Sequence, residues 1–141
     1  MGALPLHRWI GTQEGLVRFD GVEFKTYDKS QYPGLNNNFI WDIDEDNHGN
    51  LWLATAGGGV SCFDEFKFTY YDTSDGLANN YANTILAAKD GTIWIGTEDG
   101  LNRLKDGRPV PSNPALGRAG FYFVSIIFFV ILCPLLSIWQ K

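Results

Sequence analysis

The stretch Gly49-Asn50-Leu51-Trp52-Leu53-Ala54-Thr55 decides the fold, because its second half occurs three times along the chain. Trp9-Ile10-Gly11-Thr12 lies 43 residues before it, and Trp94-Ile95-Gly96-Thr97 lies 42 residues after it. Each copy is followed within a few residues by glycine and an aliphatic residue, in the pairs Gly15-Leu16, Gly59-Val60 and Gly100-Leu101. A fixed period of this length predicts a repeat architecture, in which one supersecondary unit is copied along the chain.

One period of the sequence contains four short segments with the composition of β-strands. Residues 41–44, 51–55, 60–63 and 66–71 are rich in apolar, aromatic and β-branched residues, and Gly, Asn and Asp separate them. We therefore expect an all-β fold, a partial β-propeller of four-stranded antiparallel blades. A solenoid is the alternative. Helical repeats are excluded, because the repeat region shows no sustained 3.6-residue apolar period.

The order of motifs within the period resembles a known family. Trp-Ile-Gly-Thr is followed by Gly-Leu, by an aromatic pair such as Phe24 and Tyr27, by Gly34-Leu35-Asn36-Asn37 and by a Gly-x-Leu-Trp lead-in. This order is similar to the two-component regulator propeller repeat, over roughly residues 9–107. The resemblance implies a periplasmic propeller of the kind found in hybrid sensor histidine kinases. Those propellers sense extracellular ligands, often glycans, and signal through a membrane helix.

The number of repeats is too small for a closed ring. Residues 9–107 hold two to three incomplete repeats, which we interpret as one complete blade and parts of two others. A closed propeller needs about four to eight blades. We expect a fragment of a longer protein. Assembly of several copies into one propeller is the alternative.

The C-terminal part of the chain has a different composition. Residues 108–118 contain three prolines and are expected to form an extended linker. Residues 119–140 contain a 19-residue apolar run from Phe121 to Trp139, long enough as a helix to cross a bilayer. We predict a transmembrane helix here, with a buried core helix as the alternative. Arg108 and Arg118 would place the repeats in the cytoplasm, whereas the resemblance implies the periplasm.

Charge and residue content exclude several functions. The net charge of -5 argues against binding a nucleic-acid backbone. We expect neither a metal site nor a cofactor, because Cys62 and Cys133 have no ligand partners at a suitable spacing. The Asp42-x-Asp44-x-Asp46 run lacks the later residues of a calcium loop, so we interpret it as solvated carboxylates. The chain has two histidines, neither on a predicted inner strand, and we expect no enzyme activity.

A binding surface is the remaining functional feature. In a propeller the connections between blades and the glycine turns after Trp-x-x-Thr lie on one face, where amides and hydroxyls beside aromatic rings suit sugars. The alternative is that the asparagines only satisfy the backbone of turns. The candidate ligand-binding residues are Asn36, Asn37, Asn38, Trp41, Thr55, Asn79, Asn80, Tyr81 and Thr97.

These features together predict a membrane-tethered fragment of a ligand-sensing propeller of a two-component signalling protein, acting by non-catalytic binding. Its partners would be a glycan or other small extracellular ligand, the membrane, and further repeats or a histidine kinase outside this chain. A fragment of a propeller-type lyase and a structural protein-interaction module are the alternatives.

Overall fold

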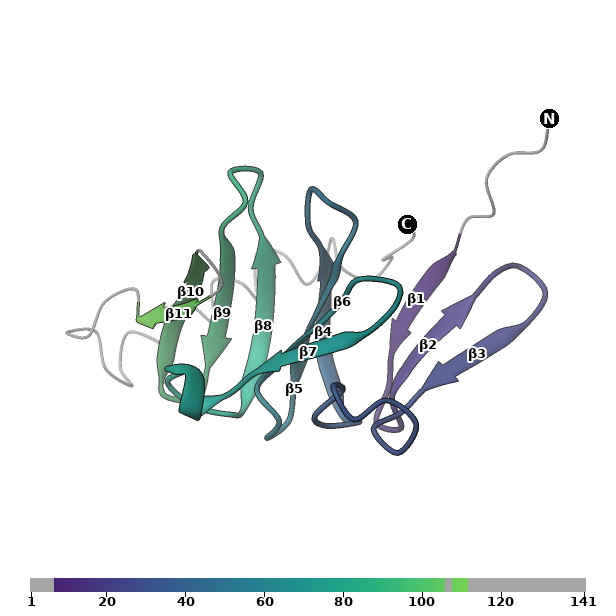
Figure 1. The fold of residues 1–141 in the computed structure, drawn as a ribbon, viewed down its shortest axis with the longest axis horizontal. Coiled ribbons are helices and arrows are strands. Elements are labelled where there is room, and N and C mark those ends of the chain that lie inside the picture. The colour runs from purple at the N-terminus through teal and green to yellow at the C-terminus, as the bar shows by residue number, and fades with distance from the viewer. Residues whose placement is uncertain (1–6, 106–107, 112–141) are drawn as a thin grey trace, which may run out of the picture.

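The computed structural model describes residues 7–105 and 108–111, and this part of the chain is built from strands. A single 3-10 turn, η1 (Thr73–Asp75), lies among them. The strands form three antiparallel sheets that lie side by side (Figure 1). They are β1 (Arg8–Gly11), β2 (Leu16–Phe19), β3 (Phe24–Tyr27), β4 (Ile40–Glu45), β5 (Leu51–Thr55), β6 (Val60–Phe63), β7 (Phe68–Tyr71), β8 (Ala82–Ala87), β9 (Ile93–Thr97), β10 (Gly100–Lys105) and β11 (Arg108–Pro111).

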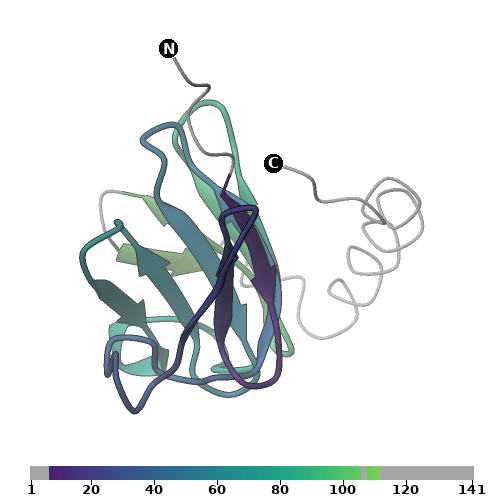
Figure 2. The ribbon, with the colours of Figure 1, turned by 90° about the vertical axis from the view of Figure 1, so that its right-hand side faces the viewer.

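Each sheet follows the order of the sequence, so each repeat forms one sheet. The second sheet is ordered β4-β5-β6-β7 and the third β11-β10-β9-β8, which confirms the prediction of four-stranded antiparallel units. The first sheet contains β1, β2 and β3, the counterparts of the last three strands of a complete sheet. Figure 2 looks from the side of the first sheet and shows the sheets one behind another.

Two of the three sheets are complete, whereas the sequence suggested one complete blade. The difference is β11, which pairs with β10 at residues that we expected to begin the linker. Pro109 and Pro111 are compatible with this strand because it lies at the edge of its sheet, where a missing N–H breaks few ladder bonds. The rest of the expected linker, residues 112–118, lies outside the described residues.

The repeated Thr and Gly of the motif build the turn that ends each central strand. Thr55 donates from both its N–H and its Oγ1 to the carbonyl of Gly59, at 3.1 and 2.8 Å. Gly59 has φ of 75°, and a Cβ there would lie 2.1 Å from the carbonyl oxygen of Tyr71. Only glycine fits this backbone and this space. The hydroxyl bond recurs at 2.8 Å in the other two repeats, where the glycine follows the threonine by three residues instead of four.

Apolar side chains fill the space between neighbouring sheets. Trp52, 6% exposed, belongs to a core in which the second sheet packs on the third, together with Ile85 and Ile95. Its counterpart Trp9 packs on the second sheet, with its ring 5.7 Å from that of Phe63 and nearly perpendicular to it. Trp9 and Trp52 are therefore packing residues between blades.

The predicted transmembrane helix at residues 119–140 lies outside the described residues. Within residues 7–105 and 108–111, no helix is both long enough and apolar enough to span a membrane.

Candidate functional site

The predicted binding face is formed where the connections between sheets meet the glycine turns. Asn36 donates from Nδ2 to the carbonyl of Gly58 at 3.0 Å, and Asn37 donates to the carbonyl of Ala56 at 2.9 Å. The amides of Gly57 and Gly59 donate to the carbonyl of Asn80. Both connections thus lie against the same turn, at the lower edge of Figure 1.

The asparagine side chains on this face all bind protein groups. Asn38 and Asn80, which are 42 residues apart, accept from the N–H groups of Lys29 and Thr73 at 2.7 and 2.8 Å. Asn37 and Asn79 each accept from the amide two residues later, and the bond from Tyr81 to Asn79 is 2.7 Å long. Asn79 also donates to a carboxylate oxygen of Asp99 at 2.8 Å. These amides hold the connections in shape, and a ligand would have to share or replace their bonds.

Thr55 and Thr97 lie beneath the face rather than on it. Both residues are 0% exposed, and each hydroxyl donates to a glycine carbonyl of its own turn. In this structure neither hydroxyl is open to a ligand.

Trp41 and Tyr81 are the exposed aromatic residues among the candidates. Tyr81 is 50% exposed, and a Cβ at Gly57 would lie 3.4 Å from its ring, so it covers the glycine turn of the second sheet. Trp41 is 56% exposed and lies against Phe39, with ring centroids 4.8 Å apart. Trp41 also lines a groove of about 280 Å³ between β1 and β4. Tyr81 therefore lies over the glycine turn of the second sheet, and Trp41 lies beside the groove between β1 and β4.

Two aspartates of β4 have a structural role that the sequence did not predict. Asp42 and Asp44 were interpreted as solvated, but their Oδ2 atoms accept from the amides of Ile85 and Ala87 of β8, at 2.9 and 2.7 Å. Asp44 is 8% exposed. Burial raises the pKa of Asp42 to about 6, despite those hydrogen bonds. The alternation of acidic with apolar residues on an inner strand was the signal for this contact.

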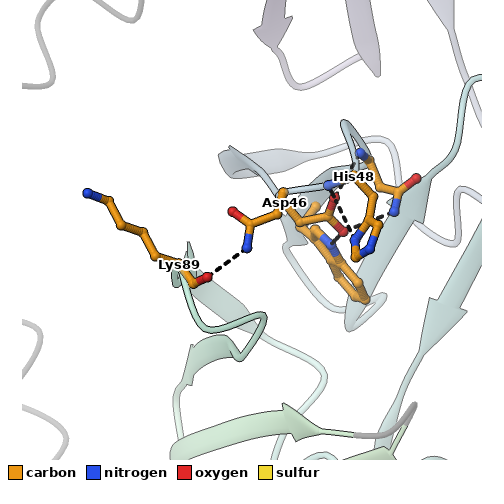
Figure 3. A network of polar contacts seen from close by, with 6 residues as sticks. Asp46, His48 and Lys89 are labelled. Carbon is orange, nitrogen blue, oxygen red and sulfur yellow. Dashed lines mark hydrogen bonds and ion pairs between the residues drawn. The ribbon is translucent and has the colours of Figure 1, made fainter.

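Asp46 organises the hairpin between β4 and β5 (Figure 3). Its carboxylate accepts from the amides of His48 and Asn50, from the Asn50 side chain and from Nε1 of Trp52 at 2.9 Å. Burial opposes ionisation, but these hydrogen bonds, led by that from Trp52, hold the pKa of Asp46 below its usual range. Asn47 donates to the carbonyl of Lys89 at 2.8 Å and links this hairpin to the next. The network is structural, and among the described residues no group of three or more His, Cys, Asp or Glu could hold a metal ion.

Comparisons with known proteins agree with the repeat architecture. Residues 34–57 and 76–99 match the family model for the two component regulator propeller. A search of curated proteins gives no match. The chain thus carries repeats of the two-component regulator propeller type.

Solved structures that are similar to this chain include extracellular domains from B. thetaiotaomicron. One is the extracellular domain of a protein described as a hybrid two component system, BT3049, at 25% identity and a TM-score of 0.66, covering 78% of this chain and 16% of that one. Another is the extracellular domain of BT4673, at 22% identity and a TM-score of 0.64, covering 75% and 17% of the two chains. This chain therefore spans about a sixth of the length of the structures it matches.

Proposed function

We propose that this chain is part of the ligand-sensing propeller of a membrane-anchored two-component signalling protein, and that it acts by binding rather than catalysis. The observation that carries the proposal is the match of two successive repeats to the two component regulator propeller. The similar solved structures are extracellular domains, which supports a periplasmic location of the repeats. The signal would pass to a histidine kinase outside this chain.

The geometry supports a surface for a polar ligand with flat apolar faces, such as a glycan. Tyr81 exposes half of its surface beside the Asn79 and Asn80 amides, and aromatic rings next to amides suit the ring faces and hydroxyls of a sugar. Trp41 offers a second exposed ring at the start of β4. The asparagines would keep their turns in place while Tyr81 or Trp41 contacts the ligand.

A binding experiment tests this proposal. Soluble oligosaccharides are titrated into the full chain in a mild detergent, and the heat of binding is measured by calorimetry. For an oligosaccharide that binds, Tyr81→Ala or Trp41→Ala should weaken the affinity about tenfold, a loss of about 1.4 kcal/mol. Phe66→Ala is the matched control, because Phe66 is 87% exposed on the hairpin between β6 and β7. Binding that neither aromatic variant weakens would place the ligand elsewhere.

A further inference from the structure

The inner strands of the two complete sheets share a β-bulge at the same place. In β4 the bulged residue is Trp41, which is left out of the register with β5, and in β8 it is Asn83, which is left out of the register with β9. The two residues are 42 positions apart and are equivalent in their repeats. A bulge re-aims the side chain of the extra residue, and bulges are frequent next to functional sites. The fold therefore sets these two side chains apart from the regular pleat of their strands.

Neighbouring sheets leave the bulged position accessible. Trp41 is 56% exposed although the third sheet packs on its own sheet, and Asn83 is partly exposed although the second sheet packs on its own. The residues just before the bulges, Ile40 and Ala82, are by contrast 6% and 0% exposed. Contact between the second and third sheets thus covers neither bulged residue fully, as expected for a position that borders the central channel of a propeller.

The side-chain amide of Asn83 forms no hydrogen bond within the described residues. The five asparagines of the predicted binding face differ in this respect, because each of their side chains binds a protein group. Asn102 also has an unpaired Nδ2, but it is 0% exposed and lies out of reach of a ligand. The Asn83 amide offers two donors and an acceptor, and a ligand can bind them without breaking a bond that holds a turn.

The two bulges lie on adjacent strands, close to an exposed aromatic ring. Asp42, next to Trp41, accepts from the amide of Ile85, two residues after Asn83, at 2.9 Å. Tyr81 precedes Asn83 by two residues and is 50% exposed over the glycine turn of the second sheet. The free amide is thus close in the fold to both exposed rings of the predicted binding face.

We propose that Asn83 is the hydrogen-bonding residue of the ligand site, and that a neutral glycan chain lies across the two bulges. Its hydroxyls bind the Asn83 amide, and its ring faces pack on Trp41 and Tyr81. This inference rests on the proposed function and adds the residue that recognises hydroxyl groups. A site that bonds a ligand hydroxyl discriminates strongly against a ligand that lacks it, so Asn83 would contribute to specificity as well as affinity.

The test measures binding of cellohexaose, xylohexaose, mannohexaose and maltohexaose to the full chain by calorimetry, in a detergent without a sugar headgroup. For a hexasaccharide that binds, Asn83→Ala should weaken the affinity about tenfold, because the hydroxyl loses its protein partner. Asn83→Gln keeps the amide and should recover part of this loss. Asn47→Ala is the matched control and should bind like the parent, because Asn47 lies in the hairpin at the other end of β4 and donates to Lys89.

Urea unfolding of the same variants separates binding from folding. Asn83→Ala should keep the midpoint of the parent, because its side chain forms no hydrogen bond within the described residues. Binding that Tyr81→Ala weakens and Asn83→Ala does not weaken would overturn this inference and leave the proposed function in place. A lower midpoint for Asn83→Ala, or an equal loss of affinity in Asn47→Ala, would also overturn it. Failure of all four hexasaccharides to bind would count against both the inference and the proposed function.

Discussion

Trp52 combines two roles that separate substitutions can distinguish. Its indole fills the core between the second and third sheets, and its Nε1 donates to Asp46. A buried indole needs an acceptor, and Asp46 supplies one while also capping the hairpin that leads into β5. In the next repeat the residue equivalent to Asp46 is Ala88, so this arrangement belongs to the middle repeat.

Two substitutions of Trp52 should therefore destabilise the fold to different extents. We expect Trp52→Ala to lower the free energy of unfolding by about 3 to 5 kcal/mol, because a buried aromatic side chain is lost. Trp52→Phe keeps most of the packing but loses the bond to Asp46, and should cost about 1 to 2 kcal/mol. Trp41→Ala is the control and should change stability by less than about 1 kcal/mol, since Trp41 is 56% exposed. Urea unfolding followed by circular dichroism measures all three, and equal stability of Trp52→Ala and the parent would refute the packing role.

Asp42 should make stability depend on pH. Burial raises its pKa in the folded state from 3.8 to about 6, so folding favours the protonated form. Its contribution is complete below about pH 4 and is lost as the pH rises through about 6, a change on the order of 3 kcal/mol. The unfolding free energy of the parent relative to Asp42→Asn should fall across this range.

Asp64→Asn is the matched control for that experiment. Hydrogen bonds from the amides of Lys67 and Phe66 hold the pKa of Asp64 below its usual value. Its contribution to stability is therefore present at neutral pH and is lost on acidification, the opposite direction. A parallel pH dependence of the parent and Asp42→Asn would show that Asp42 does not titrate as inferred.

At the scale of elements, local sequence patterns predicted the strands whose bounds are set by nearby residues. The segments 51–55 and 60–63 were predicted with the bounds that β5 and β6 have. β11 was missed because Pro109 and Pro111 argue against a strand unless its edge position is known. The bonds from Asp42 and Asp44 to β8 span 43 residues, so the alternation of acidic with apolar residues marks one face of β4 but does not identify the strand that it contacts. Part of the candidate site could likewise not be predicted from the local sequence, because the burial of Thr55 depends on the folded shape of its turn.

The glycine turns provide a test at this scale. Gly59 and Gly49 both have positive φ, at 75° and 83°, but only the first lacks space for a side chain. Gly49→Ala should cost about 1 to 2 kcal/mol for the left-handed backbone alone. Gly59→Ala should cost at least about 2 kcal/mol more, because its Cβ would meet the Tyr71 carbonyl. Urea unfolding compares the two, and similar losses would show that the turn at Gly59 can shift to admit a side chain.

At the scale of the whole molecule, neighbouring sheets are joined at several positions along their strands. The second and third sheets are linked by the Asp42 and Asp44 carboxylates, by the bond from Asn47 to Lys89 at one end, and by bonds to the Asn80 carbonyl at the other. The outer face of the first sheet has no such neighbour among the described residues, and Phe24 there is 68% exposed. In repeat proteins each unit is stabilised chiefly by its neighbours, so these bonds between sheets should contribute to the stability of both sheets that they join.

Phe24 exposes an apolar side chain on the first sheet, so a test of membrane attachment needs a control for contact through this sheet. We predict that the apolar run within residues 119–140 anchors the chain, because 19 helical residues span about 28 Å. A chain that ends at Arg118 should move from the membrane pellet to the supernatant after an alkaline wash, with the β-type circular dichroism spectrum of the repeats retained. Phe24→Lys in the full chain is the control and should stay in the pellet. If the truncated chain stays in the pellet and the full chain with Phe24→Lys moves to the supernatant, the exposed sheet holds the protein at the membrane instead of the C-terminal segment.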